Sequence, residues 1–129
     1  MILVSVVMPT WHGKTELIKR AVDSVLAQTY ENVEVVLVDD NGDEASAPYR
    51  LEAQKLAKSY DGRVIYLQND KNIGAALSRN NGIEHANGEY ITFLDDDDRY
   101  LPKKVENQLT YMIENDLDMC FTELRFCNY

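Results

Sequence analysis

The chain has 129 residues, which suits one domain that can bury about two-thirds of the surface of its unfolded chain. Such a domain needs no disulfide or structural metal for its stability. Its 13 Lys and Arg residues against 22 Asp and Glu residues give a formal net charge of -9, which argues against binding a nucleic-acid backbone by charge neutralisation. An anionic substrate would require a local positive element, such as a bound cation, a helix N-terminus or a few basic side chains.

The sequence offers no candidate for a membrane-spanning segment, which would need about 20 apolar residues in a row. The apolar stretch 1–8 is also too short for the core of a signal peptide. We therefore expect a cytoplasmic location, either free or at the cytoplasmic face of the membrane within a larger protein. Cys120 and Cys127 have no second pair and no nearby His, so we predict two buried, reduced thiols and neither a zinc site nor a disulfide framework.

The first half of the chain predicts two strands, each followed by a helix. Residues 2–8 and 33–38 are apolar runs rich in β-branched side chains, which is typical of parallel strands buried on both faces. Between them, apolar side chains recur at helical spacing on one stripe, made of Leu17, Ile18, Ala21, Val22, Val25 and Leu26. A second helix begins near Pro48, a residue tolerated in the first turn, and runs towards Tyr60.

The second half repeats this alternation. Asp61-Gly62 turns the chain into a third strand over 64–67. A third helix is predicted over 75–86, although its Asn-Asn-Gly sequence at 80–82 is a poor helix former. A fourth strand follows over 90–94, and then a helix after Pro102. The apolar face of that helix comprises Val105, Leu109, Met112 and Ile113, and a last, weaker strand is expected from Met119.

The regular alternation of strands and helices predicts an α/β domain over residues 1–129. We expect a three-layer α/β/α sandwich with a mainly parallel, Rossmann-like sheet. Ligands of such sheets bind beyond the carboxyl ends of the strands. The sequence ends at 126–129 without a helix cap or a closing helix, which is typical of a fragment of a larger domain.

Three polar clusters directly follow three of the predicted strands. They are Pro9-Thr10-Trp11-His12, Asp39-Asp40-Asn41 and Asp95-Asp96-Asp97-Asp98. Because the carboxyl ends of parallel strands meet at one edge of a sheet, we expect these clusters to form one acidic crevice.

The run Asp95–Asp98 is the strongest candidate for a metal site. Adjacent carboxylates repel one another, so a run of four calls for a counter-charge. In an extended chain Asp95 and Asp97 would point to one side and Asp96 and Asp98 to the other, so one alternate pair could face a hard cation such as Mg²⁺, Mn²⁺ or Ca²⁺. The alternative is a solvated acidic turn in which Asp98 or a neighbour caps the next helix.

The other two clusters have a binding interpretation and a structural one. Asp39-Asp40 could accept hydrogen bonds from a nucleobase imide or a ribose hydroxyl, or form an Asx turn. Trp11 could stack on a base or pack against the protein. His12 and His85 have no carboxylate or Cys at catalytic spacing, so no catalytic role is assigned to them.

Two phosphate-binding alternatives lack their motifs. Gly13-Lys14-Thr15 resembles the end of a P-loop, but that motif requires Gly at position 8, where Met8 stands, and Pro9 removes a backbone N–H donor. A metal-dependent nucleotidyltransferase would need a glycine-rich basic loop after the first strand, which the sequence at 9–12 does not provide.

Several motifs together resemble the family 2 glycosyltransferases of GT-A fold. They are Val4-Ser5-Val6-Val7-Met8-Pro9-Thr10-Trp11, Ala27-Gln28-Thr29-Tyr30, Val38-Asp39-Asp40-Asn41-Gly42, Asn72-Ile73-Gly74, Ser78-Arg79-Asn80-Asn81-Gly82-Ile83 and the segment 88–98. They follow the family's order over nearly the whole chain, which makes the combination far more specific than any single motif.

This resemblance implies a nucleotide-diphosphate-sugar donor, with a lean towards UDP-sugars, and a bound Mn²⁺ or Mg²⁺. Asp97 would be the main metal ligand and Asp95 the second, as the DXD element. The implied substrate-binding residues are Pro9, Thr10, Trp11, Asp39, Asp40, Gly74, Arg79, Asn80, Asp95 and Asp96. Lys71 and Arg79 are cations that could face the diphosphate.

The implied activity is transfer of the sugar, with inversion, to a hydroxyl of an acceptor sugar, lipid or protein, as in polysaccharide biosynthesis. The acceptor-binding region and the general-base carboxylate of the family would lie beyond residue 129, so no base is named. Two departures bear on base preference: His12 replaces the usual Asn, and Asn41-Gly42-Asp43 replaces the commoner sequence after the aspartates. The alternative function is a non-catalytic nucleotide-sugar-binding or interaction module.

Overall fold

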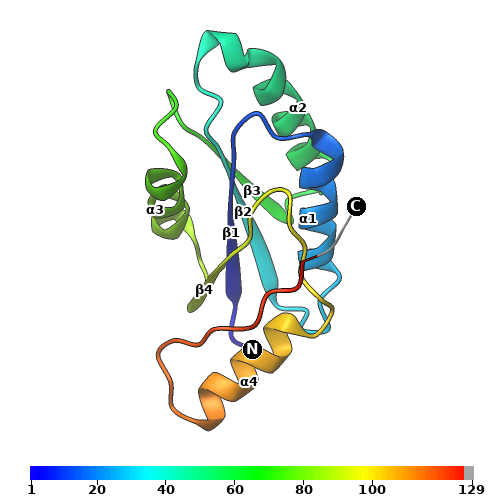
Figure 1. The fold of residues 1–129 in the computed structure, drawn as a ribbon, viewed down its shortest axis with the longest axis vertical. Helices are drawn as coiled ribbons and strands as arrows, with labels where there is room; N and C mark the ends of the chain where they lie inside the picture. The colour runs from blue at the N-terminus through cyan, green and yellow to red at the C-terminus, as the bar shows by residue number, and fades with distance from the viewer. Residues whose placement is uncertain (127–129) are drawn as a thin grey trace.

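The computed structural model describes residues 1–126, which form a four-stranded parallel sheet with helices on both of its faces (Figure 1). The sheet has the strand order β3-β2-β1-β4. The elements are β1 Val4–Thr10, α1 Thr15–Leu26, β2 Val33–Asp39, the 3-10 turn η1 Glu44–Ser46, α2 Ala47–Lys58, β3 Val64–Gln68, α3 Ala75–His85, β4 Tyr90–Phe93 and α4 Lys104–Glu114. Each predicted strand and helix up to residue 114 is present, with ends shifted by a few residues at most.

The register brings the carboxyl ends of three strands to one edge of the sheet, although β4 ends three residues earlier than β1. Thr10 at the end of β1 pairs with Asp39 at the end of β2. On the other side of β1, Val7 pairs with Phe93, the last residue of β4. The segments that follow these three strands therefore leave the sheet at the same edge.

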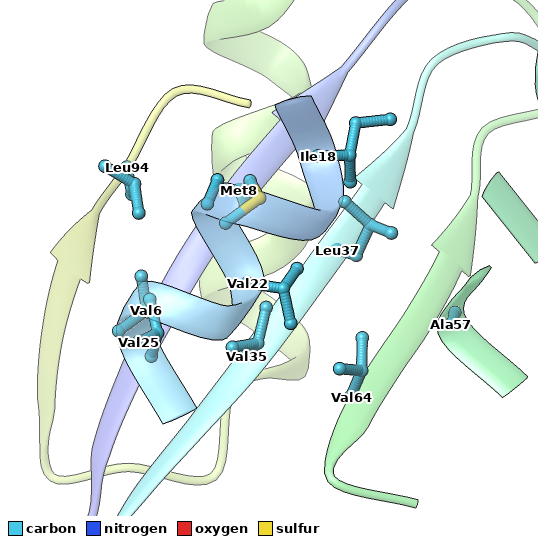
Figure 2. Packing of buried hydrophobic residues seen from close by; sticks show 11 residues of the cluster. Val6, Met8, Ile18, Val22, Val25, Val35, Leu37, Ala57, Val64 and Leu94 are labelled. Carbon is cyan, nitrogen blue, oxygen red and sulfur yellow. The ribbon is translucent and has the colours of Figure 1, made fainter. Parts of the chain in front are cut away.

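One face of the sheet is covered by α1 and α2. Side chains that alternate along β1 and β2 point to this face, because successive residues of a strand point to opposite sides. Val6, Met8, Val35 and Leu37 are fully buried there and pack with α1 (Figure 2). Of the predicted stripe on α1, the side chains of Ile18, Ala21, Val22 and Val25 are buried.

The opposite face of the sheet is covered by α3. Val7, Val36 and Val38, which alternate with the residues above, are buried on this side. A Cβ atom at Gly82 would lie 2.4 Å from Val7 Cγ1, so the backbone of α3 contacts the sheet at a distance that only glycine permits. Glycine is unfavourable inside a helix, but at position 82 it allows α3 to pack closely against the sheet.

Helix α4 packs near the amino-terminal ends of the strands, through a narrow stripe of apolar side chains. Val105 and Leu109 contact Val4, and Met112 is also buried. Ile113, predicted to share this face, is 53% exposed, so that part of the prediction is wrong. Neighbouring helical residues point about 100° apart, and α4 contacts only part of the sheet, at the start of β1 and along β4.

The weak strand expected from Met119 is absent from the described residues. Residues 119–126 have no regular structure, and within 1–126 no backbone hydrogen bond joins them to the sheet. The large apolar side chains of this segment are mostly exposed: Met119, Phe121, Leu124 and Phe126. Cys120 lies in the same segment, half-buried rather than buried as predicted, and Cys127 lies outside the described residues. Within 1–126, none of the helices has the length and apolar character needed to cross a bilayer.

Candidate functional site

A cavity of about 490 Å³ lies at the carboxyl ends of β1 and β4. It is lined by Pro9, Thr10, Trp11, Asp40, Asn72, Gly74, Ala75, Ser78, Arg79, Asp95, Asp96 and Asp97. The lining comes from the end of β1 and the residue after it, from the segments after β2 and β4, and from the first half of α3 with the loop before it. The crevice expected from the sequence therefore exists.

Nine of the residues predicted for the site line this cavity, and two do not. Asp39 is fully buried and Asn80 is exposed on α3, and both lie outside the lining. The lining residues Asn72, Ala75 and Ser78 were not singled out as site residues. Asn72 and Ser78 belong to the motifs that carry the family resemblance, which is the signal that could have identified them.

The four consecutive aspartates form a turn. The backbone N–H of Asp98 donates a 3.1 Å hydrogen bond to the carbonyl oxygen of Asp95, so the run is not extended. The turn brings carboxylate oxygens of Asp95, Asp97 and Asp98 within 4.8 Å of one another. Asp98 therefore joins Asp95 and Asp97, whereas the alternation of an extended chain would have paired it with Asp96.

Asp96 points to the other side of this turn, towards β1. Its carboxylate accepts a 2.7 Å hydrogen bond from the Thr10 hydroxyl. Burial raises the pKa of Asp96, the hydrogen bond from Thr10 opposes this, and repulsion from Asp97 and Asp95 raises it further. A Cβ atom at Gly13 would lie 2.5 Å from both Thr10 Oγ1 and Asp96 Oδ2. The glycine of the discarded P-loop motif thus makes room for this hydrogen bond.

Two arginines contact the acidic turn from different helices. Arg20 of α1 donates a 2.6 Å hydrogen bond to the carbonyl oxygen of Asp97. Arg79 of α3 forms a 3.0 Å ion pair with Asp95, and their side chains are 35% and 55% exposed. Such an exposed pair contributes little stability, so Arg79 can exchange Asp95 for another anion at small cost.

The carboxylates of the turn retain excess negative charge despite these contacts. Burial raises the pKa of Asp98, repulsion from Asp97 and Asp95 adds to this, and Arg20 opposes it. Asp98 does not cap the following helix: Lys103 occupies the N-cap position of α4, and the Val105 N–H in its first turn donates instead to Gln28 Oε1. The donor set of Asp95, Asp97 and Asp98 consists of oxygen atoms alone, which fits a hard divalent cation.

Asp39 organises the loop after β2. One of its oxygens accepts hydrogen bonds of 2.9 Å from the backbone nitrogen and 2.7 Å from the side-chain nitrogen of Asn41. The bond from the backbone nitrogen forms an Asx turn. Its other oxygen accepts a hydrogen bond from the Tyr66 hydroxyl. Burial and then the hydrogen bond to Asp39 raise the pKa of Tyr66. Asp39 is fully buried, and its carboxylate holds Asn41 and Tyr66 in place.

Asp40 connects the end of β2 to the start of α3. Its carboxylate accepts hydrogen bonds from the backbone N–H of Ile73 and of Gly74, both at 2.9 Å, and from the Asn69 side chain at 2.8 Å. Only 3% of Asp40 is exposed, yet it forms part of the cavity wall. The residue therefore fixes the loop that carries Gly74 and leads into α3, the helix of Arg79.

The two histidines occupy different surroundings. His85 lies exposed on α3 and its Nδ1 is 2.9 Å from the carbonyl oxygen of Asn81, away from the cavity lining. His12 stacks on Trp11, and Trp11 is 53% exposed at the cavity wall, so Trp11 is not a core residue.

A second cavity, of about 550 Å³, lies between β4 and α4. Its wall includes Thr92, Lys104, Gln108 and Cys120. It contains none of the polar clusters that follow the strands, so the chemistry predicted from the sequence belongs to the smaller cavity.

Known proteins match this chain over almost its whole length. Residues 5–129 match the family model described as Glycosyl transferase family 2. The uncharacterized glycosyltransferase MJ1057 of Methanocaldococcus jannaschii is 37% identical over 128 residues, covering 96% of this chain and 42% of that protein. WcaA of Escherichia coli, whose name assigns it to colanic acid biosynthesis, is 42% identical over 103 residues, covering 80% of this chain and 35% of that protein. This chain spans less than half the length of these relatives.

Solved structures share the fold. The structure of S. aureus TarS in complex with UDP-GlcNAc has a TM-score of 0.74 at 22% identity and covers 89% of this chain and 32% of that one. The mannosyltransferase PcManGT from Pyrobaculum calidifontis, in complex with GDP-Man and Mn²⁺, has a TM-score of 0.71 at 22% identity and covers 86% of this chain and 32% of that one. The predicted GT-A fold is confirmed by these likenesses.

Proposed function

The chain belongs to glycosyl transferase family 2, and we propose that its cavity binds a nucleotide-diphosphate sugar together with a divalent cation for transfer of the sugar to an acceptor hydroxyl. One observation carries this proposal. Three carboxylates converge within 4.8 Å of one another, and two of them, Asp95 and Asp97, line a cavity at the carboxyl edge of the sheet. That edge is where open α/β sheets bind their ligands.

The proposed metal ligands are Asp97 and Asp95, with Asp98 as a third candidate. Asp97 is the best placed of them, because Asp95 is already paired with Arg79. Mn²⁺ or Mg²⁺ fits this all-oxygen donor set. When bound, such a cation supplies Lewis-acid stabilisation of the negative charge that grows on the diphosphate leaving group.

The remaining lining residues support the binding of the donor. Arg79 is the only cation among the described residues that line the cavity, and its exposed pair with Asp95 leaves it able to contact the diphosphate. Thr10 holds Asp96, so the turn that carries Asp95 and Asp97 is fixed to the end of β1. Trp11 offers its ring to the nucleobase at the rim. Transfer would invert the anomeric centre through in-line displacement.

The proposed donor is a UDP-sugar. TarS is described in complex with UDP-GlcNAc, which supports uridine, and PcManGT is described with GDP-Man, so guanosine is the alternative to be compared. The name of WcaA, which refers to colanic acid, supports an acceptor in polysaccharide biosynthesis.

Isothermal titration of the 129-residue chain with UDP, with and without Mn²⁺, tests the proposal. We expect binding that requires Mn²⁺, and Asp97→Asn should weaken it about tenfold or more, because a direct ligand matters at least as much as the residues that orient one. Glu114→Gln, which removes an acidic side chain from the exposed surface of α4, is the matched control and should bind like the wild type. Unchanged affinity of Asp97→Asn in Mn²⁺ would contradict the assigned role.

A transfer assay with UDP-sugars separates the enzyme from a module that only binds nucleotide sugars. Release of UDP in the presence of an acceptor supports catalysis, whereas Mn²⁺-dependent binding without turnover supports the binding module. The two outcomes require the same binding site and differ only in the chemistry that follows.

A further inference from the structure

Three rings form one continuous stack beside the cavity. The centroids of Trp11 and His12 are 4.2 Å apart with an angle of 17° between the ring planes. Those of His12 and Tyr49 are 4.3 Å apart with an angle of 13°. Trp11 and His12 follow β1, whereas Tyr49 lies in the first turn of α2, so the stack joins two segments that are distant in sequence. His12 is the middle ring.

The position of His12 is fixed by two buried side chains. Its backbone N–H donates a 2.9 Å hydrogen bond to Asn41 Oδ1, and its ring Nε2 lies 2.8 Å from Ser46 Oγ. Asn41 and Ser46 are only 1% and 2% exposed, so both are rigid supports. His12 also has a φ of 50°, a left-handed conformation that is strained for most side chains. Such strain persists only where surrounding contacts impose it.

The stack ends at Trp11 on the side of the cavity. Trp11 lines the cavity and is 53% exposed, while one face of its ring is covered by His12. A tryptophan ring without such support would move among several rotamers and lose that freedom on binding a ligand. Held by His12, the ring presents a prepared flat surface.

We propose that His12 and Tyr49 are positioning residues that hold the Trp11 ring so that the nucleobase of the donor stacks on it as a fourth ring. This inference rests on the proposed function, because it assumes that the cavity binds a nucleotide. It assigns a role to His12, which departs from the residue usual in the family, and to Tyr49. Neither side chain need touch the ligand.

Two variants remove one ring each and leave the backbone supports in place. His12→Asn keeps the backbone N–H that donates to Asn41 Oδ1. Asparagine also tolerates the left-handed conformation of position 12 better than most residues. Tyr49→Leu removes the outer ring but keeps an apolar side chain, and Tyr49→Phe restores the ring without the hydroxyl. Tyr111→Leu, at an exposed tyrosine of α4, is the control for loss of a tyrosine elsewhere.

The first measurement uses fluorescence without ligand. Trp11 is the only tryptophan of the 129 residues, so its emission reports on the stack directly. We expect the emission of Trp11 to change in intensity and shift to the red in His12→Asn, with the wild-type spectrum kept in Tyr111→Leu. Identical spectra for His12→Asn and wild type would show that the two rings do not stack.

The second measurement compares UDP with inorganic pyrophosphate, both in the presence of Mn²⁺. Only UDP carries a nucleoside, so the ratio of the two affinities reports on uridine. The ribose is the same for wild type and variants, so a change in this ratio reports on the stacking of the base. We expect this ratio to fall about two- to tenfold in His12→Asn and in Tyr49→Leu, the contribution of about one aromatic pair. Pyrophosphate affinity should stay unchanged, and Tyr49→Phe should restore the ratio.

The outcomes separate this inference from the proposed function. If UDP binds the wild type, and Trp11→Ala weakens it while His12→Asn and Tyr49→Leu do not, the positioning role is wrong and the nucleotide site stands. If both variants weaken UDP and pyrophosphate equally, the stack has only a structural role. If the wild type binds neither ligand in Mn²⁺, the proposed function fails and this inference fails with it.

Discussion

The Thr10 hydroxyl donates a 2.7 Å hydrogen bond to the Asp96 carboxylate and so joins the end of β1 to the acidic turn after β4. Thr10 is 2% exposed and Asp96 is half-buried. A half-buried carboxylate beside other carboxylates requires a donor to remain ionised, and this hydroxyl provides one.

Replacing Thr10 by valine keeps the shape of the side chain but removes this donor. We expect the free energy of unfolding in urea to fall by about 2 kcal/mol, the usual contribution of a hydrogen bond to a charged group. Thr10→Ser keeps the hydroxyl and should lose much less. Equal losses for the two variants would mean that packing, and not the hydrogen bond, determines the effect.

Gly13 is expected to tolerate no side chain. A Cβ atom there would lie 2.5 Å from Thr10 Oγ1 and from Asp96 Oδ2, so Gly13→Ala must separate these two groups. Overpacking of this kind costs about 1–3 kcal/mol, measurable by urea unfolding. In an Asp96→Ala background one of the two clashing groups is gone, and the same substitution should cost less. A cost that is equal in both backgrounds would contradict the steric explanation.

We expect the loop before α3 to depend on the carboxylate of Asp40, which accepts its hydrogen bonds. Asp40→Asn places an NH₂ group among three donors, those of Ile73, Gly74 and Asn69, and leaves at least one of them without an acceptor. We expect a loss of about 2 kcal/mol in unfolding free energy and faster hydrogen exchange of the Gly74 amide. Asp43→Asn, at an exposed position nearby, should change neither quantity. Unaltered exchange at Gly74 in Asp40→Asn would refute this role.

The environment of Lys104 on α4 leads us to expect that the free energy of unfolding rises with pH. Its Nζ donates a 2.6 Å hydrogen bond to Thr92 Oγ1 and lies 4.0 Å from the centroid of the Tyr100 ring. Burial lowers the pKa of Lys104 from its ordinary value of 10.5 to about 8, although the nearby Cys120 opposes this. Below pH 8 both the folded and the unfolded state carry the proton. Between these two pKa values the unfolded chain binds more protons, so stability increases with pH.

Urea unfolding at pH 7, 8 and 9 measures this effect. The free energy of unfolding of wild type should rise across the series relative to that of Lys104→Met, which lacks the titrating group. Lys103→Met, at the exposed neighbouring position, should follow the wild-type pH dependence. Parallel curves for wild type and Lys104→Met would show that Lys104 keeps its ordinary pKa.

The order and type of the elements were predictable because they depend on local patterns. Apolar runs gave the four strands, and the stripe with Ile18, Val22 and Val25 gave α1, since the spacing of apolar residues directly reflects which face an element buries. The alternation of elements gave the three-layer fold. The family resemblance was also carried by contiguous motifs, and the match over residues 5–129 confirms it.

The predictions that failed depend on contacts with other parts of the chain. A strand from Met119 needs a partner edge, and the described residues pair none with it. Ile113 has the composition of a core residue, but α4 reaches the sheet along too narrow a stripe to bury it.

By itself, the sequence determined the fold and brought three polar clusters to one edge of the sheet, because the direction of parallel strands follows from their alternation with helices. Only the tertiary structure decided how the side chains at that edge divide their roles. The hydrogen bond that closes the turn at Asp98 directs three aspartates to one side, burial turns Asp39 inwards, and the first turn of α2 brings Tyr49 onto His12. These relationships depend on distances between remote segments, which no local pattern of residues specifies.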